Sequence, residues 1–307
     1  MGKALADHDA RGRAVFDEAD AALGFPLSRL CFEGPEEQLR LTENTQPAIL
    51  TVSVAAARLL AAEGIRPDCV AGHSLGEYSA HVVAGTFSFG DAVRIVQRRG
   101  RYMQAAVPVG EGAMAAILGA DAARVEQACA EAATAGLVSP ANFNAPGQVV
   151  IAGTRAAVAL AGERAKSLGA KRVVPLPVSA PFHCALMKPA QDRLEPELRS
   201  LTAADPTVAV AANVDAEFKR TAGDAIDALV AQVSAPVRWE QVVRRLASAG
   251  VRAYVEVGPG AVLSGLVRKI DRDARVTTFE TPEQLASVAA FVAEARAASS
   301  GVPSTSA

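Results

Sequence analysis

The pattern Gly72-x-Ser74-x-Gly76 constrains this chain more than any other feature, because it follows a short apolar run and precedes a helical segment. In that setting it predicts a nucleophile elbow, a tight turn whose glycines avoid steric clashes and whose serine hydroxyl stands exposed. The following helix directs its free N–H groups at that oxygen, and the N–H of Leu75 faces a developing oxyanion. Ser74 is therefore the candidate nucleophile. The alternative is an ordinary loop, since the motif is short.

The composition bounds the class of protein. With 307 residues, half of them hydrophobic, the chain can bury one large core or a core and a small second domain. A net charge of −2 with mixed signs argues against nucleic acid or an anionic membrane as the main partner. The four cysteines lie far apart, which predicts neither a zinc site nor a disulfide framework. No signal peptide or membrane-spanning run is recognised, so we expect a cytoplasmic protein.

The chain divides into two kinds of pattern. We expect one helix from Lys3 to Leu23, and another that uses Thr42 to Thr45 as its cap and runs to Ala62. Residues 111–177 predict a βαββαβ unit of ferredoxin-like order, with strands at 113–118, 137–143, 148–152 and 172–176. The predicted fold is α/β, with an α/β-hydrolase-like parallel-sheet core (1–110 and 178–298) and a ferredoxin-like insert. Residues 299–307 predict a disordered tail.

A serine nucleophile needs a base, and the chain has only four histidines. His8 lies in a charged helix and is expected to be solvated. His73 neighbours Ser74 but points to the opposite face, so it is expected to hold the turn. His81 lies about two helical turns from the serine, roughly 10 Å away. His183 remains as the candidate base, although a lone histidine in an apolar loop is often structural. No equally clear carboxylate partner is found for it.

Another helix is predicted to start at Gly90-Asp91, and it carries four arginines: Arg94, Arg98, Arg99 and Arg101. On an amphipathic helix most of them are expected to be solvated. A guanidinium buried beside a nucleophilic serine would bind a carboxylate on the acyl group at two points, and so select malonyl over plain acyl chains. Arg99 is weighed for this role, but the pattern does not decide which arginine fills it.

Five motifs together resemble those of malonyl-CoA:acyl-carrier-protein transacylases. They occur in the family's order and span nearly the whole chain: Gly72–Ala80, Gln97–Gln104, Asn142–Val150, Pro181–Met187 and Glu256–Gly260. The resemblance implies that malonyl-CoA and acyl carrier protein are the partners, that no metal or redox cofactor is required, and that the protein is a monomer.

The resemblance also implies roles for individual residues. Ser74 would be acylated, His183 would act as general base and then acid, and Arg99 would pair with the malonyl carboxylate. The main-chain carbonyl of Gln232 would orient the histidine, which explains the missing carboxylate, and Leu75 would supply one oxyanion-hole N–H.

Four further residues are assigned to substrate binding by the same resemblance. Asn142, Asn144 and His73 are placed near the cleft. Phe182, the residue before the histidine, is expected to favour malonyl over methylmalonyl because its ring fills the space of the extra methyl group.

The chain departs from the family pattern at its start. Members normally begin with a strand and a Gln-containing loop that gives a second oxyanion N–H, and neither precedes Gly2. We expect a gap in the sheet and a barrier higher by about 3–4 kcal/mol, which lowers turnover about a hundred- to a thousandfold. Two alternatives stay open: a serine thioesterase or esterase, and a non-catalytic module that binds carrier protein.

Overall fold

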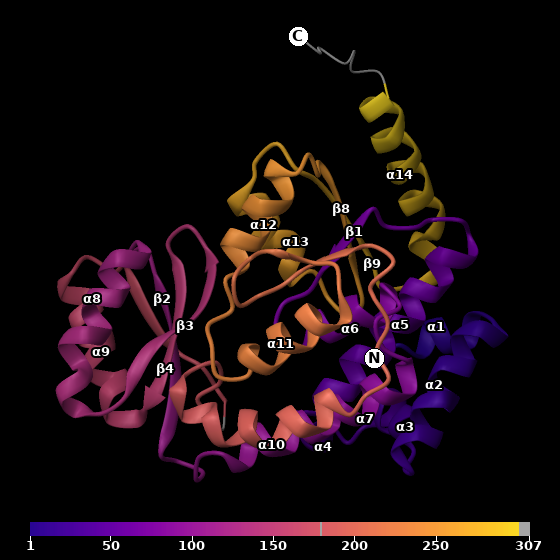
Figure 1. Cartoon of the computed structure of the whole chain (residues 1–307). Helices are drawn as coiled ribbons and strands as arrows, with labels where there is room; N and C mark the ends of the chain where they lie inside the picture. Colours follow the sequence, from indigo (N-terminus) through magenta and orange to yellow (C-terminus); the bar gives the residue numbers. More distant parts are fainter. Residues whose placement is uncertain (179, 301–307) are drawn as a thin grey trace.

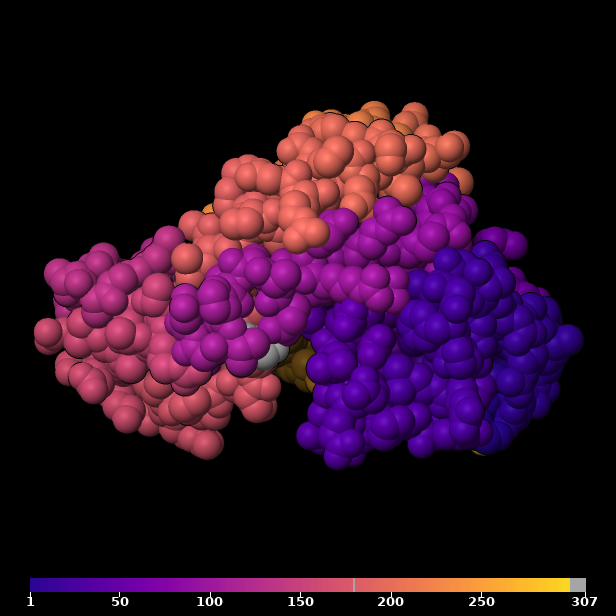
Figure 2. Space-filling model, turned by 90° about the horizontal axis from the view of Figure 1, so that it is seen from below, coloured from indigo at the N-terminus to yellow at the C-terminus, as the bar shows by residue number. Residues whose placement is uncertain are grey.

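The computed structural model describes residues 1–178 and 180–300, and the fold is a mixture of helices and short sheets (Figure 1). The middle of the chain forms a separate lobe beside a larger helical body, and the last helix extends from that body. Seen from below, a hollow separates the N-terminal segment from the middle lobe (Figure 2). The candidate site residues come from both parts, so the arrangement of the two lobes decides the site.

The N-terminal quarter is helical. Its helices are α1 (Lys3–His8), α2 (Ala10–Leu23), α3 (Leu27–Glu33), α4 (Glu36–Leu39) and α5 (Thr42–Ala62). The prediction of one helix from Lys3 to Leu23 was wrong. The chain is extended at Asp9, whose side chain caps α2 by accepting from the N–H of Gly12. Gly12 in turn lies against α1, because an added Cβ would be 2.0 Å from the carbonyl oxygen of Leu5.

Helix α5 is the centre of the larger body. It begins at Thr42, so the segment that was predicted to cap it, Thr42 to Thr45, forms its first turn. No side chain caps its N-terminus, and Pro47 lies in its second turn. By length and composition it is apolar enough to cross a membrane, contrary to expectation, yet 67% of its most apolar window is buried inside the protein. That burial is typical of a core helix. The main hydrophobic cluster joins it to α2 and α7.

The strands of the larger body are short and belong to two sheets. β1 (Cys69–Ala71) pairs in parallel with β6 (Ala209–Ala211), which pairs antiparallel with β7 (Phe218–Lys219). β8 (Ala253–Val257) and β9 (Arg275–Phe279) form a second, parallel pair. The two sheets of the body are separate from each other. The remaining elements of the body are α6 (Leu75–Val83), α7 (Phe89–Ala105), α10 (Lys188–Arg199), α11 (Ala222–Gln232), α12 (Trp239–Ser248), α13 (Val262–Ile270) and α14 (Leu285–Ser300).

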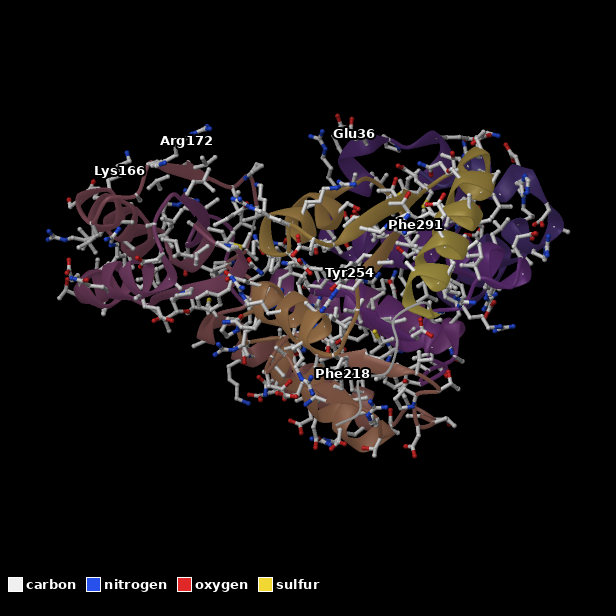
Figure 3. All side chains as sticks on the ribbon, turned by 90° about the horizontal axis from the view of Figure 1, so that it is seen from above. Glu36, Lys166, Arg172, Phe218, Tyr254 and Phe291 are labelled. Carbon is white, nitrogen blue, oxygen red and sulfur yellow. The ribbon has the colours of Figure 1, made fainter. Side chains whose placement is uncertain are left out.

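The middle lobe has the predicted order of strands and helices. Its elements are β2 (Gly112–Leu118), α8 (Ala122–Ala132), β3 (Val138–Ala145), β4 (Gln148–Thr154), α9 (Arg155–Ser167) and β5 (Arg172–Pro175). The four strands are antiparallel, in the order β3-β4-β2-β5. Helices α8 and α9 cover the outer face of the sheet, and Lys166 and Arg172 project outward from this lobe (Figure 3).

The other face of this small sheet holds the segment that carries His183. Cys184 is buried against Met114, Ala141 and Val150, and Phe182 packs against the same cluster. The residues on both sides of His183 are thus anchored to the middle lobe, and the imidazole between them faces the larger body.

The C-terminal helix is longer than expected. The predicted disordered tail began at Ser299, but α14 includes Ser299 and Ser300. Its side chains pack on β9, where the guanidinium of Arg275 lies 5.0 Å from the ring of Phe291, labelled in Figure 3. Residues 301–307 lie outside the described part of the chain.

We expect Gly100→Ala to lower the free energy of unfolding by about 1–3 kcal/mol through overpacking. Gly100 lies where α7 meets the start of α5, and an added Cβ would be 2.7 Å from backbone atoms of Thr42 and Glu43. The measurement is urea unfolding followed by circular dichroism. The matched control is Gly265→Ala in α13, where no atom lies within 4 Å of the added Cβ, so that helix propensity adds roughly 0.5–1 kcal/mol. Equal stability of the two variants would contradict the tight contact of α5 and α7.

Candidate active site

Ser74 stands in a strained turn between β1 and α6. Its backbone has φ 52° and ψ −106°, a conformation that L-residues rarely adopt. Gly72 is required here, because a Cβ at that position would lie 2.0 Å from the backbone of Gly76. A Cβ at Gly76 would meet nothing within 4 Å, so the expectation that both glycines prevent clashes holds for Gly72 and was wrong for Gly76.

His183 lies within hydrogen-bond distance of the serine. The Ser74 Oγ–His183 Nε2 distance is 2.7 Å, and His183 Nδ1 lies 3.0 Å from the main-chain oxygen of Gln232. A carbonyl oxygen only accepts, so Nδ1 carries the proton and donates it, and the lone pair of Nε2 faces the hydroxyl. Burial, together with the positive charge of Arg99, lowers the pKa of His183 to about 3. The neutral tautomer that accepts from the serine therefore exists throughout the physiological range.

Arg99 reaches the same hydroxyl from the opposite side. Its side chain is only 2% exposed, and Nη2 donates to Ser74 Oγ over 3.0 Å and to Gln232 Oε1 over 2.9 Å. Nη1 donates to Gln46 Oε1 over 2.8 Å. The structure thus selects Arg99 from the four arginines of α7. Arg94, Arg98 and Arg101 are exposed and form ion pairs with surface carboxylates.

Arg99 is a buried cation whose contacts are neutral acceptors. Within residues 1–178 and 180–300, no carboxylate lies at ion-pair distance from its guanidinium. Burial lowers the pKa of Arg99, while Tyr78 and Glu77 act in the other direction. A buried guanidinium without an anionic partner is suited to bind the carboxylate of a ligand.

Two residues that the sequence analysis did not single out hold the elbow. Asn213, after β6, accepts from the N–H of Ser74 over 2.6 Å and donates from Nδ2 to the carbonyl of Gly72 over 2.8 Å. Glu77, one turn after the serine on α6, is fully buried and accepts from the N–H of Asn213 and from Gln232 Nε2. A signal for Glu77 existed, since an acidic residue on an otherwise apolar helix face is costly to bury without partners.

The four residues assigned to substrate binding lie at different distances from the serine. His73 Nε2 is 2.9 Å from Asn144 Oδ1, and its ring centroid is 5.8 Å from that of Trp239. His73 and Phe182 line a cavity of about 210 Å³ together with Ser74, Arg99 and His183. Asn144 reaches this cavity only through His73. Asn142 is buried on β3 beside Val237 and does not line the cavity.

The other histidines behave differently from His183. His81 is buried on α6, where its Nδ1 lies 3.2 Å from Thr86 Oγ1 and makes no contact with the serine.

Groups of three or more side chains suited to hold a metal ion do not occur among the described residues. The expected weak turnover of a chain with one oxyanion donor stays a prediction.

The sequence and the fold are similar to those of known proteins. The sequence model of the acyl transferase domain matches residues 1–292. The malonyl CoA-acyl carrier protein transacylase of Escherichia coli K12 is 53% identical over 274 residues, which cover 89% of this chain and 88% of that protein.

Solved structures give the same result. An acyl carrier protein S-malonyltransferase from Vibrio cholerae superposes with a TM-score of 0.92 at 45% identity and 94% coverage of both chains. A malonyl-transacylase solved in complex with its type II PKS acyl-carrier protein superposes with a TM-score of 0.92 at 44% identity, covering 95% of this chain and 94% of that one. The chain therefore belongs to the malonyl-CoA:acyl carrier protein transacylase family.

Proposed function

We propose that this protein transfers a malonyl group from malonyl-CoA to the phosphopantetheine thiol of an acyl carrier protein, for fatty acid synthesis. The observation that carries the proposal is the position of Ser74 Oγ, which lies within hydrogen-bond distance of a histidine on one side and of a buried arginine on the other. The first contact supplies a base for a nucleophile, and the second supplies a site for an acyl group that ends in a carboxylate.

The reaction proceeds in two half-reactions. His183 Nε2 accepts the proton of Ser74 Oγ as the oxygen attacks the thioester carbonyl, and the main-chain carbonyl of Gln232 steadies the imidazolium that forms. The N–H of Leu75, the first residue of α6, stabilises the oxyanion together with the positive end of the helix. His183 then returns the proton to coenzyme A as it leaves. The carrier-protein thiol attacks the malonyl-serine in the same way, which gives ping-pong kinetics.

Selection of the acyl group depends on the cavity beside the serine. Arg99 pairs with the malonyl carboxylate in place of its present contact with the serine hydroxyl. Phe182, which lines the cavity next to the histidine, leaves no room for a methyl branch and disfavours methylmalonyl. His73 and Asn144 shape the wall through their mutual hydrogen bond, and Asn142 supports β3 behind them.

The fold proposal follows from connectivity. The strand-elbow-helix unit at Ser74 and the order of serine before histidine support an α/β-hydrolase-like core made of residues 1–110 and 178–298. The antiparallel order β3-β4-β2-β5 with two helices on one face supports a ferredoxin-like subdomain made of residues 111–177.

The setting of the protein is proposed from its relatives and its surface. A soluble, cytoplasmic monomer that meets a carrier protein fits the mixed surface charge. Neither nucleic acid nor a membrane is required as a partner. The relative solved with a type II PKS acyl-carrier protein makes polyketide carriers a second class of acceptor.

Exposure to malonyl-CoA should give a malonyl-enzyme that intact-mass spectrometry detects and that Ser74→Ala abolishes, because Ser74 Oγ is the hydroxyl within hydrogen-bond distance of His183 Nε2. His183→Ala should lower the rate of acylation by about 10²–10⁴-fold, the range for loss of a general base. Ser79→Ala is the matched control on the same helix and should acylate normally. A wild type that forms no acyl-enzyme while it still binds carrier protein would favour the non-catalytic binding module.

The same preparation separates transfer from hydrolysis. Radiolabelled malonyl-CoA is incubated with and without holo carrier protein, and the label is followed in carrier protein and in free malonate. Label on the carrier is expected. Free malonate alone, at the same rate in both incubations, would instead identify a thioesterase or esterase.

Arg99→Gln should reverse the preference for malonyl over acetyl. Loss of a buried charge partner costs about 2–5 kcal/mol, which corresponds to a fall of roughly 30-fold or more in kcat/KM for malonyl-CoA. Acetyl-CoA, which carries no carboxylate, should not suffer this loss. Arg98→Gln is the matched control, since the neighbouring Arg98 is exposed and pairs with Glu197. Equal losses with both substrates in Arg99→Gln would contradict the assigned role.

A further inference from the structure

The side-chain amide of Gln232 stands between two buried charges. Its Oε1 accepts from Arg99 Nη2 over 2.9 Å, and its Nε2 donates to Glu77 Oε2 over 2.7 Å. Gln232 is fully buried at the end of α11, and Glu77 is fully buried on α6. The carboxylate and the guanidinium are therefore linked through an amide rather than paired directly.

From this arrangement we propose that Glu77 is a positioning residue for the transfer reaction. In this proposal the Gln232 side chain is a spacer that prevents the Glu77 carboxylate from pairing directly with Arg99. The inference rests on the proposed function and assigns a purpose to two side-chain groups that the mechanism above does not use. Without the spacer, the nearest buried anion would occupy the guanidinium and compete with the acyl carboxylate.

Glu77 also fixes the groups that touch the reacting atoms. Its Oε2 accepts from the N–H of Asn213, whose side chain binds the N–H of Ser74 and the carbonyl of Gly72. Gln232 Nε2 donates to the carbonyl of Ser74 as well as to Glu77. One carboxylate thus holds both the loop that carries the elbow contacts and the residue whose main-chain carbonyl orients His183.

The network leaves one acceptor unused. Glu77 Oε1 has no hydrogen-bond partner among the described residues, although it is buried. If the carboxylate only tied structural elements together, both of its oxygens would be expected to accept hydrogen bonds. The negative charge is retained at this cost because it compensates a cation that must stay available to substrate.

Burial sets the protonation of this network. It raises the pKa of Glu77 to about 7, against the hydrogen bonds from Gln232 and Asn213 and the charge of Arg99, while Asp215 acts with burial. The charged and titratable groups around Glu77 are Arg99 from α7, Asp215 after β6 and Tyr78 on its own helix. Below that pH the carboxyl is protonated, accepts more weakly and no longer offsets Arg99, so activity falls as pH decreases through about 7. His183 titrates far lower and cannot cause this change.

The first experiment compares pH profiles of kcat/KM for malonyl-CoA, which report the free enzyme. The wild type should show an acid limb near pH 7. Glu77→Gln should lose that limb and show a flat profile about tenfold below the wild-type plateau, the difference between a charged and a neutral acceptor. Asp215→Asn, which removes an exposed carboxylate from the same loop as Asn213, is the matched control and should keep the limb. The limb should move to lower pH, because the charge of Asp215 helps to raise the pKa of Glu77.

The second experiment tests the spacer role of Gln232. It also tests the proposal if the Glu77→Gln variant alone is too unstable to assay. Gln232→Ala lets Glu77 close onto Arg99, so KM for malonyl-CoA should rise roughly tenfold or more. Adding Glu77→Gln to Gln232→Ala should bring KM back toward the wild-type value, since no anion is left to capture the guanidinium. A purely structural role would make the double variant worse.

The outcomes separate the two levels of inference. Absence of malonyl-serine in the wild type overturns the proposed function itself. Normal acylation of the wild type, with an unchanged acid limb in Glu77→Gln or with equal KM in Gln232→Ala and the double variant, overturns only the roles given to Glu77 and Gln232.

Discussion

The burial of one guanidinium beside the nucleophile governs the architecture of this protein. Moving a cation out of water costs several kcal/mol even after relaxation, and Arg99 is 2% exposed. The cost is offset by acceptors from separate parts of the chain: Gln46 on α5, Ser74 at the elbow and Gln232 at the end of α11. Because the guanidinium fork is rigid, these three elements are held in one relative position. The hydrogen bonds of Arg99 therefore fix both the geometry of the site and the relative positions of α5, the elbow and α11.

The acceptors around the Arg99 guanidinium are neutral, which leaves the guanidinium able to bind an anionic ligand. A carboxylate in direct contact would satisfy Arg99 better, but it would also fill the place that the proposed mechanism gives to the malonyl carboxylate. Two amides and a hydroxyl bind the cation less strongly, and a bound anion can displace the hydroxyl without leaving a buried charge exposed to apolar surroundings. In the proposed mechanism Arg99 is thus satisfied by the protein's own acceptors and still gains from binding an acidic acyl group, so that acyl groups with a carboxylate are preferred to those without one.

Sequence patterns predicted the elements that depend on local chemistry. Helix α5 ends at Ala62, as predicted, because its apolar positions recur with helical spacing up to that residue. The elbow and the middle lobe were found for the same reason, and His183 was reached by elimination among four histidines. The break at Asp9 was missed because helical periodicity continues across it, while the deciding contact, Gly12 against Leu5, is tertiary. Asn213 was missed, and the partners of Glu77 could not be named, because the contacting residues lie more than 130 residues apart in the sequence.

Backbone strain at Ser74 and His183, the proposed nucleophile and base, explains why so many polar contacts surround them. Ser74 has φ 52° and His183 has φ 59°, and such backbone conformations cost about 1–3 kcal/mol each for residues other than glycine. Each is restrained from two sides: the Ser74 N–H and carbonyl by Asn213 and Gln232, and His183 by the Gln232 carbonyl and its anchored neighbour Cys184. Relaxing either backbone would break buried hydrogen bonds whose unsatisfied groups cost as much as the strain itself. The strained geometry is therefore held by the protein's own contacts, so that in the proposed mechanism the hydroxyl and the imidazole meet substrate already aligned.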